Sequence, residues 1–169
     1  IDRQIEEGDK FYIRNVSWVG NSQYSTELLQ AMLGIEKGDT YDKKTLHKRL
    51  GIGRETDIED MSQISSLYQN NGYLMSVIEP SEIVVGKDSI DLEIKVFEGR
   101  PFTINNVEIS GNQRVDDEVI RREIYTRPGE LYNRALLMQT LRQLSQMQHF
   151  DPASIMPQIQ PVSTDLVDI

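Results

Sequence analysis

The chain has 169 residues and a formal net charge of −9, so it has room for one domain or two small ones. The negative charge argues against a nucleic-acid partner and against broad attraction to an anionic membrane. The absence of cysteine excludes disulfides and thiolate metal sites, and no apolar run approaches the length of a membrane-spanning helix.

The sequence repeats itself after 91 residues. Residues 11–21 (FYIRNVSWVGN) return as residues 102–112 (FTINNVEISGN). A fixed period indicates an array of modules, and arrays are more often scaffolds or binding surfaces than single catalytic pockets. We expect residues 9–99 and 100–169 to form two modules, and residues 1–8 to be the end of a preceding one. The last strand of the second module is expected to be truncated at the end of this sequence.

Each module is predicted to open with a strand that is followed by two helices. The alternation of apolar residues breaks at Asn15 and again at Asn106, which predicts a β-bulge or an extended lead-in. The helix N-caps are predicted from side chains that accept hydrogen bonds from free backbone amides. These caps are Ser25 and Asp42 in the first module, and Asp116 and Asn133 in the second.

The second helix of the first module contains an insert. Leu46 matches Leu137 at an offset of 91, but Ile64 matches Leu141 at an offset of only 77, so about 14 residues near 47–60 are extra. Two glycines within residues 51–53 make this stretch too flexible for a regular helix. The helix is therefore predicted to break there and to resume near Asp57.

Two strands complete each module. Residues 76–85 form the first of them, and Pro80 places it at a sheet edge because proline cannot donate a ladder hydrogen bond. Residues 90–97 alternate as a half-buried strand. The counterparts in the second module are residues 155–162 and an unfinished strand from Asp165. The predicted fold class is α+β, with a three-stranded mixed sheet covered by two helices in each module.

The sequence predicts no catalytic residue, no cofactor and no metal site. His47 and His149 lie in different modules, and neither has a nearby nucleophile or carboxylate in the pattern of a triad. Asp57, Glu59 and Asp60 lack the glycine and the terminal glutamate of a calcium loop. A solvated acidic turn is the simpler interpretation of these carboxylates.

The sheet edges are candidate binding surfaces. An unpaired edge offers N–H and C=O groups that accept an extended peptide as a further strand. The candidate edge positions are Ser76, Val77, Ile78, Ile155 and Met156. Pro80, Pro157 and Pro161 support an opposite interpretation with equal weight, because proline at an edge prevents such pairing.

A basic–acidic cluster surrounds the first helix of the second module. It comprises Arg121, Arg122 and Glu123, with Arg127 and Arg134 nearby. One interpretation is a solvated helix face. The other is a docking surface for an acidic partner, since arginine pairs with carboxylates in a bidentate manner.

The two modules are joined by a short segment that comprises Phe97, Glu98, Gly99, Arg100 and Pro101. Gly99 permits a bend and Pro101 limits it, so a semi-rigid joint is expected. Phe97 falls on the polar phase of its strand. It is interpreted either as a residue that packs against the adjacent module or as an exposed hydrophobic anchor.

The repeated pattern resembles the POTRA domain family, whose members are periplasmic modules that precede outer-membrane β-barrels. The resemblance rests on the element order, the I-x-x-V-x-[WI]-x-G-N opening, the Gly-x-x-Tyr before the second helix and the Glu-Gly joint. The second module, with residues 119–124 (VIRREI) and 129–132 (GELY), most resembles the barrel-proximal POTRA domain of outer-membrane protein assembly factors. The first module, with Gly72 and Tyr73 before its second strand, resembles the penultimate one.

The resemblance implies a non-enzymatic scaffold at the periplasmic face of the bacterial outer membrane. Such a scaffold receives unfolded outer-membrane β-barrel proteins by edge-strand pairing and docks accessory lipoproteins, here on Arg121, Arg122 and Glu123. It also implies a C-terminal membrane barrel in the parent chain. The alternatives are the POTRA region of a dedicated outer-membrane secretion or translocation pore, and a small enzyme with an unrecognised site.

Overall fold

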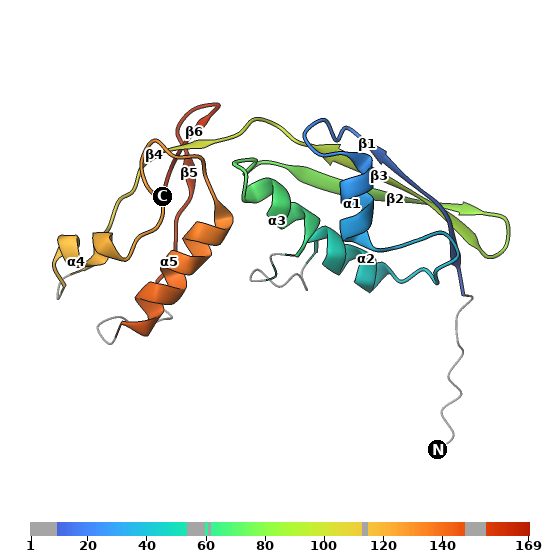
Figure 1. Ribbon diagram of the computed structural model, residues 1–169, viewed down its shortest axis with the longest axis horizontal. Helices are drawn as coiled ribbons and strands as arrows, with labels where there is room; N and C mark the ends of the chain where they lie inside the picture. Colours follow the sequence, from blue (N-terminus) through green and yellow to red (C-terminus); the bar gives the residue numbers. More distant parts are fainter. Residues whose placement is uncertain (1–9, 54–59, 61, 113–114, 148–154) are drawn as a thin grey trace, which may run out of the picture.

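The computed structural model describes residues 10–53, 60, 62–112, 115–147 and 155–169. Two modules lie side by side and are joined by the segment between β3 and β4 (Figure 1). The prediction for residues 1–8 lies outside the described residues, as do residues 54–59 of the predicted insert.

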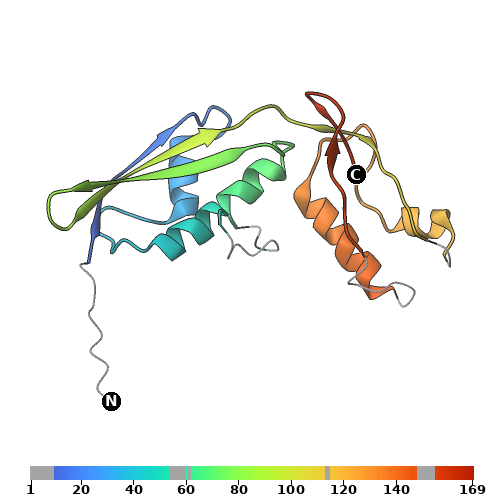
Figure 2. The same cartoon turned by 180° about the vertical axis from the view of Figure 1, so that it is seen from behind.

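The first module is built on a mixed sheet of three strands. These are β1 (Tyr12–Val19), β2 (Val77–Val85) and β3 (Ser89–Phe97). The central strand β3 runs parallel to β1 and antiparallel to β2, which confirms the predicted mixed sheet. The strand that contains Pro80 lies at the sheet edge, as predicted. The helices cover one face of this sheet, as the view from behind also shows (Figure 2).

The core of the first module lies between the sheet and these helices. Alternate side chains of β3 point into it, and each is at most 4% exposed. The helices contribute leucines at helical spacing, which are fully buried. The core residues contributed by β3 and the first two helices are Ile90, Leu92, Ile94, Val96, Leu29, Leu33, Leu46 and Leu50.

Both opening strands contain the predicted β-bulge. The register skips Arg14 between Ile13 and Asn15 in β1, and it skips Asn105 in the opening strand of the second module. The guanidinium of Arg14 pairs with the carboxylate of Asp91. Asn105 Nδ2 donates to an oxygen of Asp168 at 2.7 Å, so the repeat extends to a matching side-chain pair on each bulge.

Three helices occur in the first module where two were predicted. They are α1 (Thr26–Leu33), α2 (Lys43–Leu50) and α3 (Ile64–Gln69). The predicted break is confirmed at Gly51, whose φ of 77° ends α2 and whose added Cβ would lie 1.9 Å from Ser65 Oγ. Before α3, Asp60 accepts hydrogen bonds from the amide and hydroxyl of Ser62. The predicted resumption near Asp57 lies outside the described residues.

The predicted caps differ in how they are used. Ser25 accepts from the amide of Leu28 at 3.2 Å, and Asp42 accepts from the amides of Lys44 and Thr45. Asp116 has the position of an N-cap but makes no side-chain cap hydrogen bond. Gln63, the N-cap of α3, likewise makes no side-chain cap hydrogen bond.

The second module repeats this plan with shorter strands. It contains β4 (Thr103–Asn106), α4 (Asp117–Arg122), α5 (Arg134–Gln146), β5 (Gln160–Pro161) and β6 (Leu166–Asp168), with the sheet order β4-β6-β5. Asn133 caps α5 by accepting from the amide of Leu136 at 3.1 Å. The buried core of the second module comprises Phe102, Ile104, Val107, Tyr132, Leu137 and Val167.

The predicted strand over residues 155–162 is wrong in extent. Only Gln160 and Pro161 pair, with Asp168 and Val167. Residues 155–159 are not part of a strand in the structure.

Candidate functional site: a free strand edge beside the joint between modules

The outer side of β2 is a free edge nine residues long. The opposite edge of the sheet is partly covered, because Ile13 exchanges hydrogen bonds of 2.7 and 2.8 Å with the backbone at Gly38 and Asp39. Within the described parts of the chain, no strand pairs with the outer side of β2. The structure therefore leaves β2 as the edge that can accept a further strand.

Pro80 fixes which amides of β2 point outward. Proline has no N–H, so in an antiparallel ladder it fits at a position whose nitrogen points away from the neighbouring strand. Pro80 lies opposite Ile94 of β3. Because the direction alternates with a period of two, the amides of Ile78, Glu82 and Val84 share the outward direction. Proline thus removes one donor from this edge and leaves three.

The helix-facing side of this edge is occupied by side chains along part of its length. Ile78 is 6% exposed, and Lys43 Nζ lies 3.4 Å from an oxygen of Glu82. Burial and the neighbouring Glu82 carboxylate raise the pKa of the Tyr41 hydroxyl, which keeps it protonated. Beyond Glu82, Val84 on the same side is 60% exposed.

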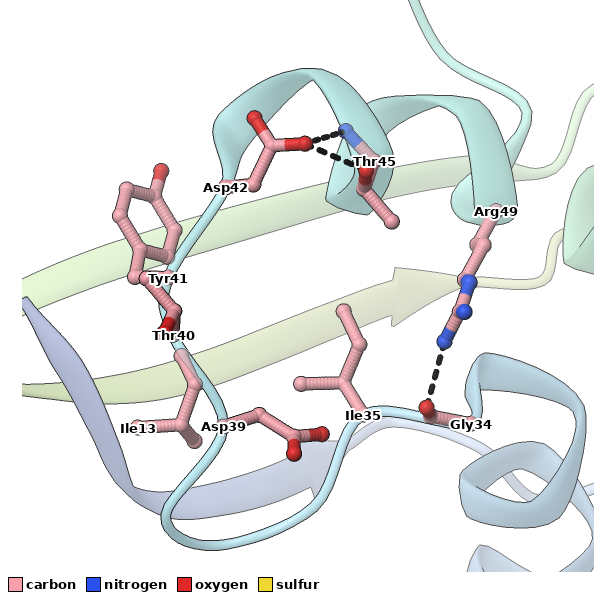
Figure 3. A pocket seen from close by; sticks show the side chains of 9 residues that line it. All are labelled: Ile13, Gly34, Ile35, Asp39, Thr40, Tyr41, Asp42, Thr45 and Arg49. Carbon is pink, nitrogen blue, oxygen red and sulfur yellow. Dashed lines mark hydrogen bonds between the residues drawn. The ribbon is translucent and has the colours of Figure 1, made fainter.

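A small cavity of about 190 Å³ lies between α2 and the loop that precedes it, residues 34–42 (Figure 3). Its polar residues form hydrogen bonds with the ends of the neighbouring helices. Arg49 Nη1 donates to the carbonyl of Leu33 at 2.7 Å, and Asp42 caps α2. These groups stabilise helix ends, so the cavity is explained by the fold without a ligand.

The predicted edge positions of the first module lie together, but they differ in what they offer. Ser76 immediately precedes β2, Val77 is its first residue and is 47% exposed, and Ile78 is buried. Only the backbone of Ile78 can reach a bound peptide. The structure thus brings this predicted set to a free edge.

The predicted edge positions of the second module do not lie in a strand. Ile155 and Met156 precede β5, and Met156 is 77% exposed. The edge strand β5 has two residues, and one of them is Pro161. The structure therefore does not place Ile155 and Met156 on a strand edge.

Ile155 and Met156 instead line a cavity of about 630 Å³ against α5. The cavity is also lined by Ile120, Leu137 and Leu141, so these two residues face the helices and not a sheet edge.

Glu98, within the joint, is an acceptor that the sequence analysis did not assign. Its side chain is 8% exposed and accepts from the hydroxyl of Ser22, from the amide of Gln23 at 3.0 Å and from the hydroxyl of Tyr68 at 3.0 Å. Burial opposes the charged form, but these hydrogen bonds outweigh it and hold the pKa of Glu98 below its usual value. The alternation of β3 could have indicated this role, because Glu98 falls on the same buried side as Ile94 and Val96, and a buried carboxylate needs hydrogen-bond donors.

The two modules contact each other through α3 and α5. Asn70 Oδ1 accepts from the amide of Ala135 at 2.9 Å, and Arg134 Nη1 donates to Gln69 Oε1 at 2.9 Å. The amide of Phe102 donates to the carbonyl of Gly72 at 2.8 Å. The first module thus helps to cap a helix of the second.

Arg134 therefore belongs to the joint, although the sequence analysis grouped it with the arginines around α4. A signal was present in the sequence. A cation at the first position of a helix is unfavourable next to the helix dipole, so it calls for an acceptor from elsewhere. Gly99 adopts a φ of 70° and makes the expected bend, whereas Phe97 is 55% exposed and does not pack against the second module.

The remaining predicted docking residues lie at the end of α4. Arg121 Nε pairs with Asp117 at 2.7 Å, and its Nη1 donates to the carbonyl of Val107 at 3.2 Å. Arg122 is exposed, and Glu123 is half-buried at the helix C-cap. Arg121 is thus held by its own module, and Arg122 is the freer cation of the pair.

Two negative findings apply to the residues that the structure describes. Among them, no helix combines the length and apolar character needed to cross a membrane. No three histidine or carboxylate side chains in these parts are grouped so that they could hold a metal ion.

Comparison with known proteins gives relatives for nearly the whole chain. A putative outer membrane protein assembly factor of Treponema pallidum is 26% identical over 167 residues, which cover 98% of this chain and 18% of the relative. The outer membrane protein assembly factor BamA of Neisseria meningitidis is 26% identical over 147 residues, which cover 85% of this chain and 18% of the relative. The chain thus spans about a fifth of the length of these curated relatives.

Solved structures show the same fold. The crystal structure of Haemophilus influenzae BamA POTRA3-5 matches with a TM-score of 0.74 at 20% identity, covering 94% of this chain and 59% of that one. BamA from Haemophilus ducreyi lacking POTRA domains 1-3 matches with a TM-score of 0.74 at 17% identity, covering 94% and 28%.

The family assignment comes from two successive matches that follow the two sheets of the structure. The model of the POTRA family, described as surface antigen variable number repeat, matches residues 11–99 and 102–169. Each match contains one three-stranded mixed sheet with its helices. This chain belongs to the POTRA family and comprises two POTRA modules in tandem.

Proposed function

We propose that this POTRA pair is a non-enzymatic scaffold at the periplasmic face of the outer membrane, where it receives unfolded outer-membrane β-barrel proteins by strand addition. The observation that carries the proposal is the free edge of β2, which is nine residues long and unpaired in the described structure. The names of the relatives, which are outer-membrane protein assembly factors, support the client class.

Strand addition suits a scaffold that must accept many unfolded clients. The hydrogen bonds run between backbones, so they depend little on the client's side chains. Transmembrane β-strands are about ten residues long, which is close to the length of β2. A strand of that length can be held along the whole edge.

A titration with extended, barrel-derived peptides tests the proposal. We expect backbone amide shifts at Ile78, Glu82 and Val84. A Val84→Pro variant removes an outward donor and should weaken binding, whereas the matched Val84→Thr control keeps the amide and should bind as the parent does. Shifts scattered away from β2, or equal binding by the two variants, would contradict strand addition at this edge.

The same titration separates the assembly function from that of a dedicated secretion pore. Peptides from a soluble exported protein serve as the second client class. Comparable or tighter binding of the exported peptides would favour the secretion pore. A preference for the barrel-derived peptides would favour the assembly machine.

We also propose that an accessory lipoprotein docks at the end of α4, on Arg121, Arg122 and Glu123. Because Arg121 is engaged with Asp117 and Val107, the proposal places the main contact on Arg122. Arg122→Glu should weaken lipoprotein binding at low salt more than a substitution at exposed Arg100 does. Unchanged affinity of Arg122→Glu would remove this surface from the proposal.

A further inference from the structure

The open face of the first sheet carries an ordered pattern next to the free edge. Side chains of β2 alternate, and those of Val77, Glu79, Ser81 and Ile83 lie on the face turned away from the helices, opposite in phase to buried Ile78. This row is apolar at both ends and polar in the middle. An added strand would lie directly beside it.

One end of the row belongs to an exposed apolar pair. Val77 lies directly opposite Phe97 of β3, and the two side chains are 47% and 55% exposed. Val19 of β1, opposite Lys95, is 48% exposed and lies diagonally across from Phe97 on the same face. These side chains form an apolar strip that reaches the free edge at Val77.

The middle of the row carries unbalanced negative charge. Glu79 lies opposite Lys95, but Lys95 Nζ is 3.1 Å from Glu93 Oε1, so one cation serves two carboxylates. The other carboxylate of this face, Asp91, is paired with Arg14. Glu79 is exposed at the edge itself and is therefore positioned to meet a cation on an added strand.

We propose that β2 selects the register of the strand that it binds. This inference rests on the proposed function and deepens it. The preferred occupant is an extended segment of an unfolded protein that places an apolar side chain beside Val77, a basic side chain beside Glu79 and an apolar side chain beside Ile83. The pattern is apolar-x-basic-x-x-x-apolar for parallel addition and the reverse for antiparallel addition.

The backbone reinforces this selection. A slip of one residue would move every side chain of the added strand to the opposite face. There the basic residue would lose Glu79, and the apolar residues would lie beside Ile78 and Val84 or beside Ser76 and Glu82, depending on the direction of the slip. In either case the open apolar strip would stay exposed. A correct register is therefore favoured by apolar contact and by charge at the same time.

Three nine-residue peptides test the inference on the two-module chain. The first carries the matched pattern, and the second has the same composition with both apolar residues shifted by one position relative to the basic residue, so that no register restores the pattern. The third replaces the basic residue by glutamate. Each is made in both chain directions, and Kd is measured from amide shifts along β2. The matched peptide should bind about two- to five-fold more tightly than either other peptide.

Variants of the protein assign the preference to individual side chains. Val77→Thr should remove the advantage of the matched peptide over the shifted one, whereas Val19→Thr, on the same face but two strands from the edge, should retain it. Glu79→Lys should invert the preference between basic and acidic peptides. Equal affinity of all three peptides at β2 would overturn register selection and leave strand addition intact. Absence of shifts at β2 with every peptide would overturn both.

Discussion

The two modules share one frame but expose different parts of it. The first has a nine-residue edge strand, β2, whose outer side no described strand pairs with. The second module presents the exposed end of α4 and offers the start of α5 to its neighbour. The two copies thus share the sheet order, while the first offers a strand edge and the second offers helix ends.

A glycine at the end of β1 provides the strongest way to test the packing of the first module. Gly20 has a φ of 89°, and an added Cβ would lie 2.3 Å from the carbonyl oxygen of Val96. Gly86, in the turn between β2 and β3, has a φ of 74° with nothing within 4 Å and serves as the matched control. We expect Gly20→Ala to destabilise the first module by more than about 3 kcal/mol, and Gly86→Ala to cost about 1–2 kcal/mol from backbone strain alone.

Urea unfolding measures both effects. Trp18 is the single tryptophan and lies in β1, so its fluorescence reports on the first module. Equal losses for the two variants would show that the close approach of Gly20 to Val96 adds nothing to the backbone strain.

Glu98 gives the next largest expected effect. Glu98→Ala leaves the hydrogen-bond donors of Ser22, Gln23 and Tyr68 without their shared acceptor, and it should destabilise the first module by about 2–4 kcal/mol. Trp18 fluorescence in urea measures the loss. Glu93→Gln, at a partly exposed carboxylate of the same strand, is the control and should change stability by less than about 1 kcal/mol.

The same carboxylate predicts a pH dependence. Because the folded pKa of Glu98 lies below its ordinary value of 4.5, its contribution is complete above that value and is lost as pH falls toward the folded pKa. The stability difference between the parent and Glu98→Gln should therefore shrink as the pH is lowered from neutral to below 4.5. A difference that stays constant over this range would show that the charge of Glu98 does not stabilise the fold.

Substitutions at the contact between the modules should have smaller effects on stability, and they distinguish a cap from the neighbouring module from a cap within the same module. Asn70 and Asn133 both cap α5, the first from the neighbouring module and the second from its own. Either change to alanine should cost about 0.5–2 kcal/mol. Only Asn70→Ala should broaden the distribution of inter-module orientations measured by residual dipolar couplings. A similar broadening in both variants would assign the effect to α5 and not to the contact.

The bulge pairs should give the smallest effect. Arg14→Ala and Asn105→Ala each remove an exposed side-chain pair, and each should change the free energy of unfolding by less than about 1 kcal/mol. Urea midpoints of each module measure the change. A larger loss at Arg14 alone would mean that the bulge of the first module depends on its ion pair.

The sequence could predict the features that are set locally. The interrupted alternation at Asn15 and Asn106 located both bulges, and the glycines after Leu50 located the end of α2. Pro80 located an edge strand. Each of these follows from the conformational limits of a few neighbouring residues.

The features that the sequence analysis missed depend on distant partners. The position of Arg134 is set by acceptors on α3. Likewise, the exposure of Phe97 could not be decided from its strand phase, because both an adjacent module and solvent are compatible with that phase.

Amide hydrogen exchange along β2 tests the central claim most directly. In the free protein, the outward amides of Ile78, Glu82 and Val84 should exchange quickly, and the intervening amides bonded to β3 should exchange slowly. Addition of an unfolded barrel segment should slow the three outward amides and leave β5 unchanged. Unaltered exchange at these three amides, or protection that appears in the second module instead, would contradict the account.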